Sequence, residues 1–169
     1  MKYLKILTLV LFSFQLGHSQ DNLVITFSEN NNLKLNDLEI TSNTSFEVIA
    51  NEIGQESTFV EKVDGGIYIY DNGLSFNVIS GIIISMSINF NWDGDENVSA
   101  KTFQGKFLIN NVEITKDITE NEVLLVEGLE LICPFPGMCM SKDKTPGVVK
   151  AMVAFEDSRI TQFGFILNR

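Results

Sequence analysis

The chain has 169 residues, of which 22 are acidic and 12 are basic, so its formal net charge is −10 at pH 7. So acidic a surface repels phosphate backbones and anionic lipid headgroups, which argues against nucleic acid and lipid surfaces as partners. The single histidine, His18, lies in a segment that we expect to be removed on export, so the mature chain has no imidazole for a catalytic triad or a zinc site.

Residues 1–19 have the features of a cleavable signal peptide. A start with two lysines is followed by the apolar stretch Leu4–Phe14, which is too short to span a membrane, and Gly17 and Ser19 are small residues before a cut at Gln20. Removal of this segment leaves 10 basic and 22 acidic residues, a net charge of −12. No later apolar run is long enough to cross a bilayer. We therefore expect a periplasmic or secreted protein without a membrane span.

Two parts of the mature chain share a pattern at a spacing of about 75 residues. Leu33–Ile40 matches Phe107–Ile114, with apolar on apolar and polar on polar positions. Shortly after each segment comes the pattern T-x-x-E-V, once from Thr44 and once from Thr119. Both matches occur in nearly the same register, which indicates a tandem duplication.

Each T-x-x-E-V pattern predicts the start of a short helix. The threonine hydroxyl accepts from a backbone amide of the first turn, and the glutamate reaches back to the amide of the threonine, which together form a capping box. A glycine ends each expected helix, Gly54 after residues 45–53 and Gly128 after residues 120–127.

After each helix the apolar period changes from helical to alternating, which predicts antiparallel strands. In the first half the expected strands are Gly66–Tyr70, Leu74–Val78 and Ile82–Phe90, and in the second half they are Val149–Phe155 and Ile160–Leu167. A sheet with one apolar face needs a cover, and the helix is the available one. The sequence therefore predicts an α+β fold of two tandem repeats of about 75 residues, each a short helix packed on an antiparallel β-meander.

The expected layout is a signal peptide at 1–19, a first repeat at 20–90, an acidic linker at 91–101 and a second repeat at 102–169. The linker carries oxygen side chains at alternate positions, a spacing that can surround calcium: Asn91, Asp93, Asp95 and Asn97. It does not match an EF-hand loop, because Glu96 stands where the turn glycine is required. A solvated acidic turn explains the segment more simply, and calcium binding is the alternative.

Cys133 and Cys139 flank the turn Pro-Phe-Pro-Gly-Met. In an exported protein this spacing predicts a local disulfide that shapes a protruding loop. A redox pair is the alternative, but the spacing is not C-x-x-C, and no basic residue lies close enough in sequence to activate a thiol.

Five side chains are candidates for a partner-binding surface: Tyr68, Tyr70, Trp92, Phe135 and Met138. The two tyrosines alternate with isoleucines, so they should share one face of their strand; if the isoleucines face the helix, the tyrosines point outward. Trp92 lies near the start of the acidic linker, and Phe135 and Met138 lie in the disulfide loop. Each side chain also has a purely structural explanation, namely packing against the core or its own loop.

A repeat that opens with a T-x-x-E-V-capped helix, ends that helix at glycine and continues in antiparallel strands resembles the β-lactamase-inhibitor-protein-like superfamily. That superfamily includes small outer-membrane-assembly lipoproteins of the bacterial envelope. The resemblance covers residues 33–90 and 107–167, and the segment Phe103–Asn110 is also similar to uncharacterised exported bacterial domains. The superfamily resemblance implies a protein-binding module of the envelope.

The chain has no phosphate-binding glycine loop and no nucleophile motif, so we expect neither enzymatic activity nor a cofactor beyond the calcium alternative. The prediction is an exported, non-catalytic module that binds another envelope or secreted protein. The alternative is a calcium-dependent carbohydrate-binding protein or a carboxylate-based hydrolase, which requires acidic groups that converge. A structural component of the cell surface is a third interpretation.

Overall fold

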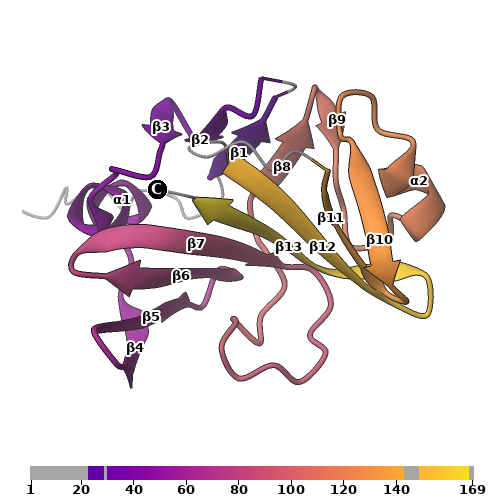
Figure 1. The fold of residues 1–169 in the computed structure, drawn as a ribbon. Coiled ribbons are helices and arrows are strands. Elements are labelled where there is room, and N and C mark those ends of the chain that lie inside the picture. The colour runs from indigo at the N-terminus through magenta and orange to yellow at the C-terminus, as the bar shows by residue number, and fades with distance from the viewer. Residues whose placement is uncertain (1–22, 29, 143–148, 168–169) are drawn as a thin grey trace, which may run out of the picture.

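The protein folds into two β-sheets, shown by a computed structural model that describes residues 23–28, 30–142 and 149–167 (Figure 1). Within these residues a small sheet has five strands in the order β3-β2-β1-β8-β9, and a large sheet has eight in the order β10-β11-β12-β13-β7-β6-β5-β4. The small sheet is made of β1 (Val24–Phe27), β2 (Leu33–Leu35), β3 (Leu38–Ile40), β8 (Lys106–Ile109) and β9 (Val112–Glu113). The large sheet is made of β4 (Ser57–Lys62), β5 (Gly65–Tyr70), β6 (Leu74–Ile79), β7 (Ile82–Asn89), β10 (Leu131–Phe135), β11 (Met138–Ser141), β12 (Val149–Glu156) and β13 (Arg159–Leu167).

The large sheet consists of two four-stranded meanders, β4 to β7 and β10 to β13, which pair side by side through β7 and β13. This central pairing is antiparallel and sets Ile88 opposite Phe163 and Met86 opposite Phe165. The small sheet also combines distant parts of the chain, because β1 pairs in parallel with β8. Both sheets therefore contain strands from the first and the second half of the chain.

One hydrophobic core fills the space between the two sheets. The ring of Phe27 on β1 lies 5.0 Å from that of Phe165 on β13, and the ring of Phe107 on β8 lies 4.9 Å from that of Phe163. All four rings are buried. Burial of each such side chain stabilises the fold by about 2–3 kcal/mol, so this aromatic layer helps to hold one sheet on the other.

Two short helices lie at opposite ends of the molecule, α1 (Phe46–Ile53) and α2 (Glu120–Leu124) (Figure 1). The capping box of α2 is confirmed, since the side chains of Thr119 and Glu122 cap each other's backbone amides. The predicted box of α1 is wrong. That helix begins after Ser45, whose side chain makes no capping bond, and the Thr44 hydroxyl accepts from the backbone amide of Thr41 instead.

The helices end differently from each other. Gly54 ends α1 as predicted, with a left-handed φ of 65° and a hydrogen bond from its amide to Ala50. α2 ends at Leu124, short of the predicted residue 127, and Leu125 caps it. The two helices contain only eight and five residues, so they cannot cover a sheet of eight strands.

The predicted α+β fold of two helix-on-meander repeats is wrong, because the protein is mostly β and consists of two sheets that share one core. The cause lies in the two matching segments that precede the T-x-x-E-V patterns, because each of them forms a hairpin. Residues 33–40 turn back at Asn36, which has a φ of 53°, and residues 106–113 turn back at Asn110 and Asn111, with φ of 47° and 69°. The resulting hairpins, β2-β3 and β8-β9, join through β1 to form the small sheet.

Candidate functional site

The tyrosine pair lies on one face of β5, as the alternation predicts, but this is the inner face. The Tyr68 ring is 4.0 Å from the ring of Phe46 on α1, and the Tyr70 ring meets Phe76 edge-on at 5.9 Å. The condition for outward-pointing tyrosines is therefore not met. Tyr70 is buried, which makes it a core residue, whereas Tyr68 is partly exposed.

Burial also changes the chemistry of Tyr70. Loss of solvent raises the pKa of its hydroxyl above the ordinary value, a hydrogen bond with Ser57 opposes this effect, and the neighbouring Tyr68 adds to it. The hydroxyl is consequently neutral at physiological pH. This pKa shift belongs to the packing of the core and gives no sign of acid–base chemistry.

The predicted linker, residues 91–101, packs against the large sheet. The Asn97 side-chain oxygen accepts from the Lys62 ammonium of β4 at 3.0 Å, and the Ser99 amide donates to the Ser75 hydroxyl of β6 at 2.8 Å. Trp92 is 52% exposed, and its indole N–H donates to the Asp95 carbonyl at 3.1 Å. The Asn97 and Ser99 bonds tie the loop to β4 and β6, and the loop displays its tryptophan.

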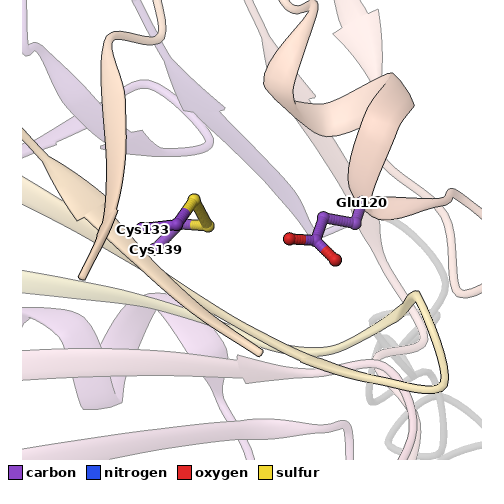
Figure 2. Close-up of side chains that lie close together, drawn as sticks. All are labelled: Glu120, Cys133 and Cys139. Atoms are coloured by element: carbon purple, nitrogen blue, oxygen red, sulfur yellow. A yellow bond between two sulfur atoms is a disulfide. The ribbon is translucent and has the colours of Figure 1, made fainter. Parts of the chain in front are cut away.

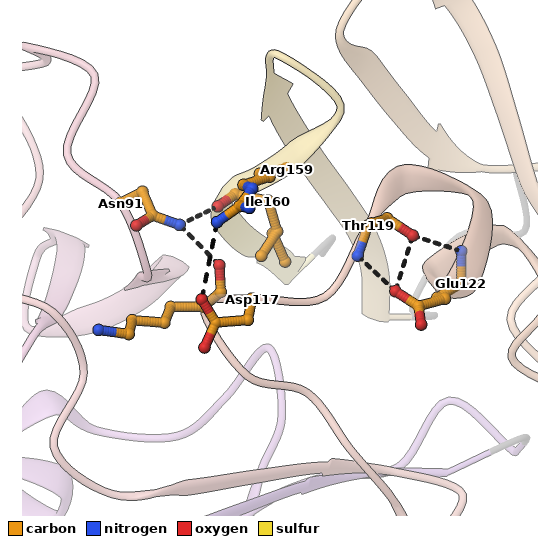
Figure 3. A network of polar contacts seen from close by, with 7 residues as sticks. Asn91, Asp117, Thr119, Glu122, Arg159 and Ile160 are labelled. Carbon is orange, nitrogen blue, oxygen red and sulfur yellow. Dashed lines mark hydrogen bonds and ion pairs between the residues drawn. The ribbon is translucent and has the colours of Figure 1, made fainter.

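Each candidate calcium-binding side chain in this loop makes hydrogen bonds within the protein. The Asn91 amide donates to the carbonyls of Lys116 (2.9 Å) and Ile160 (2.7 Å), which ties the approach to α2 to the start of β13 (Figure 3). Both Asp93 carboxylate oxygens accept from the Gln162 amide at 3.0 and 2.9 Å.

The remaining two ligands bond to each other, since an Asp95 carboxylate oxygen accepts from the backbone and side-chain amides of Asn97. The Asn97 oxygen already faces the Lys62 ammonium, a positive charge that opposes a second cation. These contacts give calcium no support, and calcium binding stays a prediction.

The region beside Asn91 contains an ion pair and the α2 cap (Figure 3). The guanidinium of Arg159 lies 3.7 Å from the carboxylate of Asp117, and both side chains are well exposed. The hydroxyl of Thr119, followed by its backbone amide, lowers the pKa of the Glu122 carboxyl. All these groups secure the chain around α2, and none is arranged as an acid–base pair.

The predicted disulfide between Cys133 and Cys139 is present, and it closes the hairpin of β10 and β11. We call residues 131–141 the disulfide hairpin. Gly137, with a φ of 73°, follows Pro136 in its turn, an arrangement typical of a type II turn. Phe135 and Met138 pair across the two strands on either side of this turn. Their side chains are 64% and 37% exposed, so the turn presents an aromatic and a thioether to solvent.

The carboxylate of Glu120 approaches the two cysteine sulfurs from the first turn of α2 (Figure 2). The three groups lie within 4.8 Å of one another. Because the sulfurs are bonded to each other, neither is a thiolate that could bind a metal ion. In this state the group is a contact between α2 and the disulfide hairpin.

Sequence reasoning missed three exposed apolar side chains near this end of the large sheet. Ile132 on β10 is 42% exposed, and Leu124 and Leu125 at the end of α2 are 39% and 83% exposed. Leu125 lies just beyond the last helical residue, and no periodic signal tells whether such a position is covered. Within the described residues β10 ends the large sheet, and only this strand order shows that Ile132 lies on a free edge strand.

The fold and these surfaces define a two-sheet β protein with a disulfide-closed hairpin at one edge of its large sheet. Residues 24–124 match the family described as a domain of unknown function (DUF7738), and the chain belongs to that family. The match runs from β1 to the end of α2, so it leaves out the disulfide hairpin, β12 and β13. No curated protein and no solved structure matches the chain significantly. Among the described residues, no helix is long and apolar enough to cross a membrane.

Proposed function

We propose that the protein is exported and acts, without catalysis, as a binding module for another protein of the cell envelope or the secretome. The observation that carries the proposal is the Phe135 side chain, which is 64% exposed at the turn of the disulfide hairpin. Export is supported by the disulfide, which persists in oxidising compartments. The predicted signal peptide, residues 1–19, lies outside the described residues.

A rigid exposed aromatic side chain suits protein recognition. Pro134 and Pro136 flank Phe135 and fix two backbone dihedrals, and the disulfide closes the loop around them. A side chain held in place before binding loses little conformational entropy when a partner covers it. Aromatic anchors of this kind commonly dominate the binding energy of an interface.

The type of contact follows from the edge strand. β10 pairs with β11 on one side and ends the sheet on the other, which within the described residues leaves its outer edge free. Pro134 has no N–H to offer an added strand, so extension of the sheet by a partner is disfavoured. We therefore expect side-chain docking, with Phe135 in an apolar pocket and with Ile132 and Met138 at the margin of the contact.

Charge indicates the kind of partner. Four glutamates belong to α2 and its exit toward β10: Glu120, Glu122, Glu127 and Glu130. Neither ion pair among the described residues, Lys106–Glu113 or Arg159–Asp117, neutralises any of them. A partner with basic groups around its pocket is favoured, and association should slow as salt is added.

Affinity capture with the disulfide-bonded protein from envelope and secreted fractions, followed by titration of the captured partner, tests the proposal. Phe135→Ala should weaken binding by about 2 kcal/mol or more, roughly 30-fold. Phe59→Ala is the matched control, because Phe59 is 50% exposed on β4 at the opposite edge of the sheet. Tyr70 is unsuitable as a probe because it is buried.

Equal affinity of the wild type and Phe135→Ala would overturn the proposed interface. Each titration is run with and without calcium, so that the alternative of a calcium-dependent carbohydrate binder is tested as well. Capture of glycans alone, and only with calcium, would contradict the protein-binding proposal.

A further inference from the structure

Three of the four methionines in the described residues gather on the outer face of the large sheet. Met138 and Met140 are two residues apart on β11, so their side chains share a face. Met140 is paired directly with Met152 on β12, so Met152 belongs to the same face. The neighbouring pair on these strands, Cys139 and Val153, is fully buried on the inner face. We call Met138, Met140 and Met152 the methionine cluster.

The cluster is compact and open to solvent. Side chains directly opposite each other in an antiparallel pair have Cβ atoms about 5 Å apart, and diagonal neighbours lie within reach of long side chains. All three methionines are partly or well exposed. Their three thioethers, each on a flexible unbranched chain, can therefore approach a single point outside the sheet.

Space for a ligand exists beside the cluster. Gly164 on β13 is paired with Met152, and since it has no side chain, the sheet surface is hollowed there. The resulting groove has a volume of about 350 Å³, and its lining includes Met138, Met152 and the carboxyl-bearing residue Asp95. A Cβ atom at Gly164 would make only ordinary contacts, at 3.7 Å or more, so packing does not require this glycine.

From this placement we propose that the methionine cluster binds a soft monovalent cation of the Cu(I) class. Thioether sulfur is a soft ligand that selects Cu(I), whereas calcium and magnesium require oxygen. The acidic groove wall at Asp95 favours a positive charge. The two cysteines are bonded to each other and do not compete as thiolates. Three thioethers complete a trigonal sulfur site, so the protein binds one ion.

Competition with a chromophoric Cu(I) chelator tests the site. The disulfide-bonded protein is titrated under anaerobic conditions, with ascorbate to keep the copper reduced and no thiol present. One equivalent should move from the chelator to the protein. In a parallel experiment with Ag(I), a redox-inert ion of similar softness, the methyl NMR signals of the three methionines should shift, while that of Met86 should not. Met86 is fully buried on the inner face.

Leucine replaces methionine at similar volume, so the variants separate ligation from packing. Met140→Leu and Met152→Leu should each lower Cu(I) affinity by more than roughly tenfold, since loss of a group that only orients a metal ligand already costs about that much. Met86 is on β7 near the same groove, but its side chain is fully buried, so Met86→Leu should leave affinity unchanged. No transfer of copper from the chelator, or full binding by the triple Met138→Leu, Met140→Leu, Met152→Leu variant, would overturn the proposal.

Discussion

Loss of the disulfide should destabilise the protein by an amount set by its loop. Cys133 and Cys139 are six positions apart, so the bond closes a loop of seven residues. The chain-entropy relation gives about 2.4 kcal/mol at 25 °C for a loop of this size, because the bond removes open conformations from the unfolded chain. In the Cys133→Ala, Cys139→Ala variant, the small cavity at the fully buried position 139 adds about 1 kcal/mol.

Urea unfolding separates these two contributions. The oxidised protein, the reduced wild type and the double alanine variant are compared at one pH, with the slope of free energy on urea checked in each case. Reduction alone should cost about 2 kcal/mol and the double substitution about 3 kcal/mol. A cost below about 0.5 kcal/mol on reduction would refute the entropic reasoning. It would mean that the Pro-Phe-Pro-Gly turn already keeps the hairpin closed in the unfolded chain.

Three further outcomes are expected. Gly73→Ala should lower the free energy of unfolding by about 3 kcal/mol or more in urea, because φ is 93° and a new Cβ would lie 2.4 Å from backbone atoms. Gly54→Ala should cost only about 1 kcal/mol, because φ is 65° and a new Cβ would make only an ordinary contact, at 3.9 Å. Thr119→Ala should lower the free energy of unfolding by about 1 kcal/mol, because it removes a helix cap. Ser45→Ala should cost clearly less in the same assay, because the Ser45 side chain makes no capping bond. Equal costs would contradict the cap assignment. The pKa of Tyr70 is raised in the folded state, so its contribution to the free energy of unfolding is fully present below the unfolded pKa of 10.0. This contribution is lost as the pH rises toward the folded pKa. Tyr70→Phe should reduce this alkaline loss of stability, which urea unfolding at several pH values measures.

Local signals in the sequence predicted a definite part of this fold. The alternating apolar pattern located β5, β6, β7, β12 and β13 to within about two residues, which is the usual precision for strand ends. The turn chemistry between Cys133 and Cys139 predicted the disulfide. These features depend on residues close together in the chain, so a sequence pattern can contain them.

The small sheet was missed because its key pairing is non-local. Val24 of β1 lies beside Lys106 of β8 in parallel register, and no periodic pattern links segments so far apart. The turns that create the sheet were visible in principle, since Asn110 and Asn111 are residues that tolerate a positive φ. Without the second sheet, the helices were the only available cover, which led to the wrong fold class.

The candidate surfaces show the same division. Exposure of Phe135 followed from its place in a proline-rich turn, whereas the direction of Tyr68 and Tyr70 depended on which face of β5 meets α1. The methionine cluster could not be inferred at all, because it depends on the register between β11 and β12. That register places Met152 next to a methionine twelve positions earlier in the chain.

Met138 belongs to both proposed surfaces, since it pairs with Phe135 in the hairpin and lines the groove beside Met152. Its substitution alone therefore cannot distinguish a lost protein contact from a lost metal ligand. Phe135 lies outside the methionine cluster, and Met152 lies one strand further into the sheet than the hairpin. Each of these residues belongs to a single surface. Normal binding of the protein partner by Met152→Leu, together with normal binding of copper by Phe135→Ala, would establish that the two surfaces act separately. Failure of one proposal would then leave the other intact.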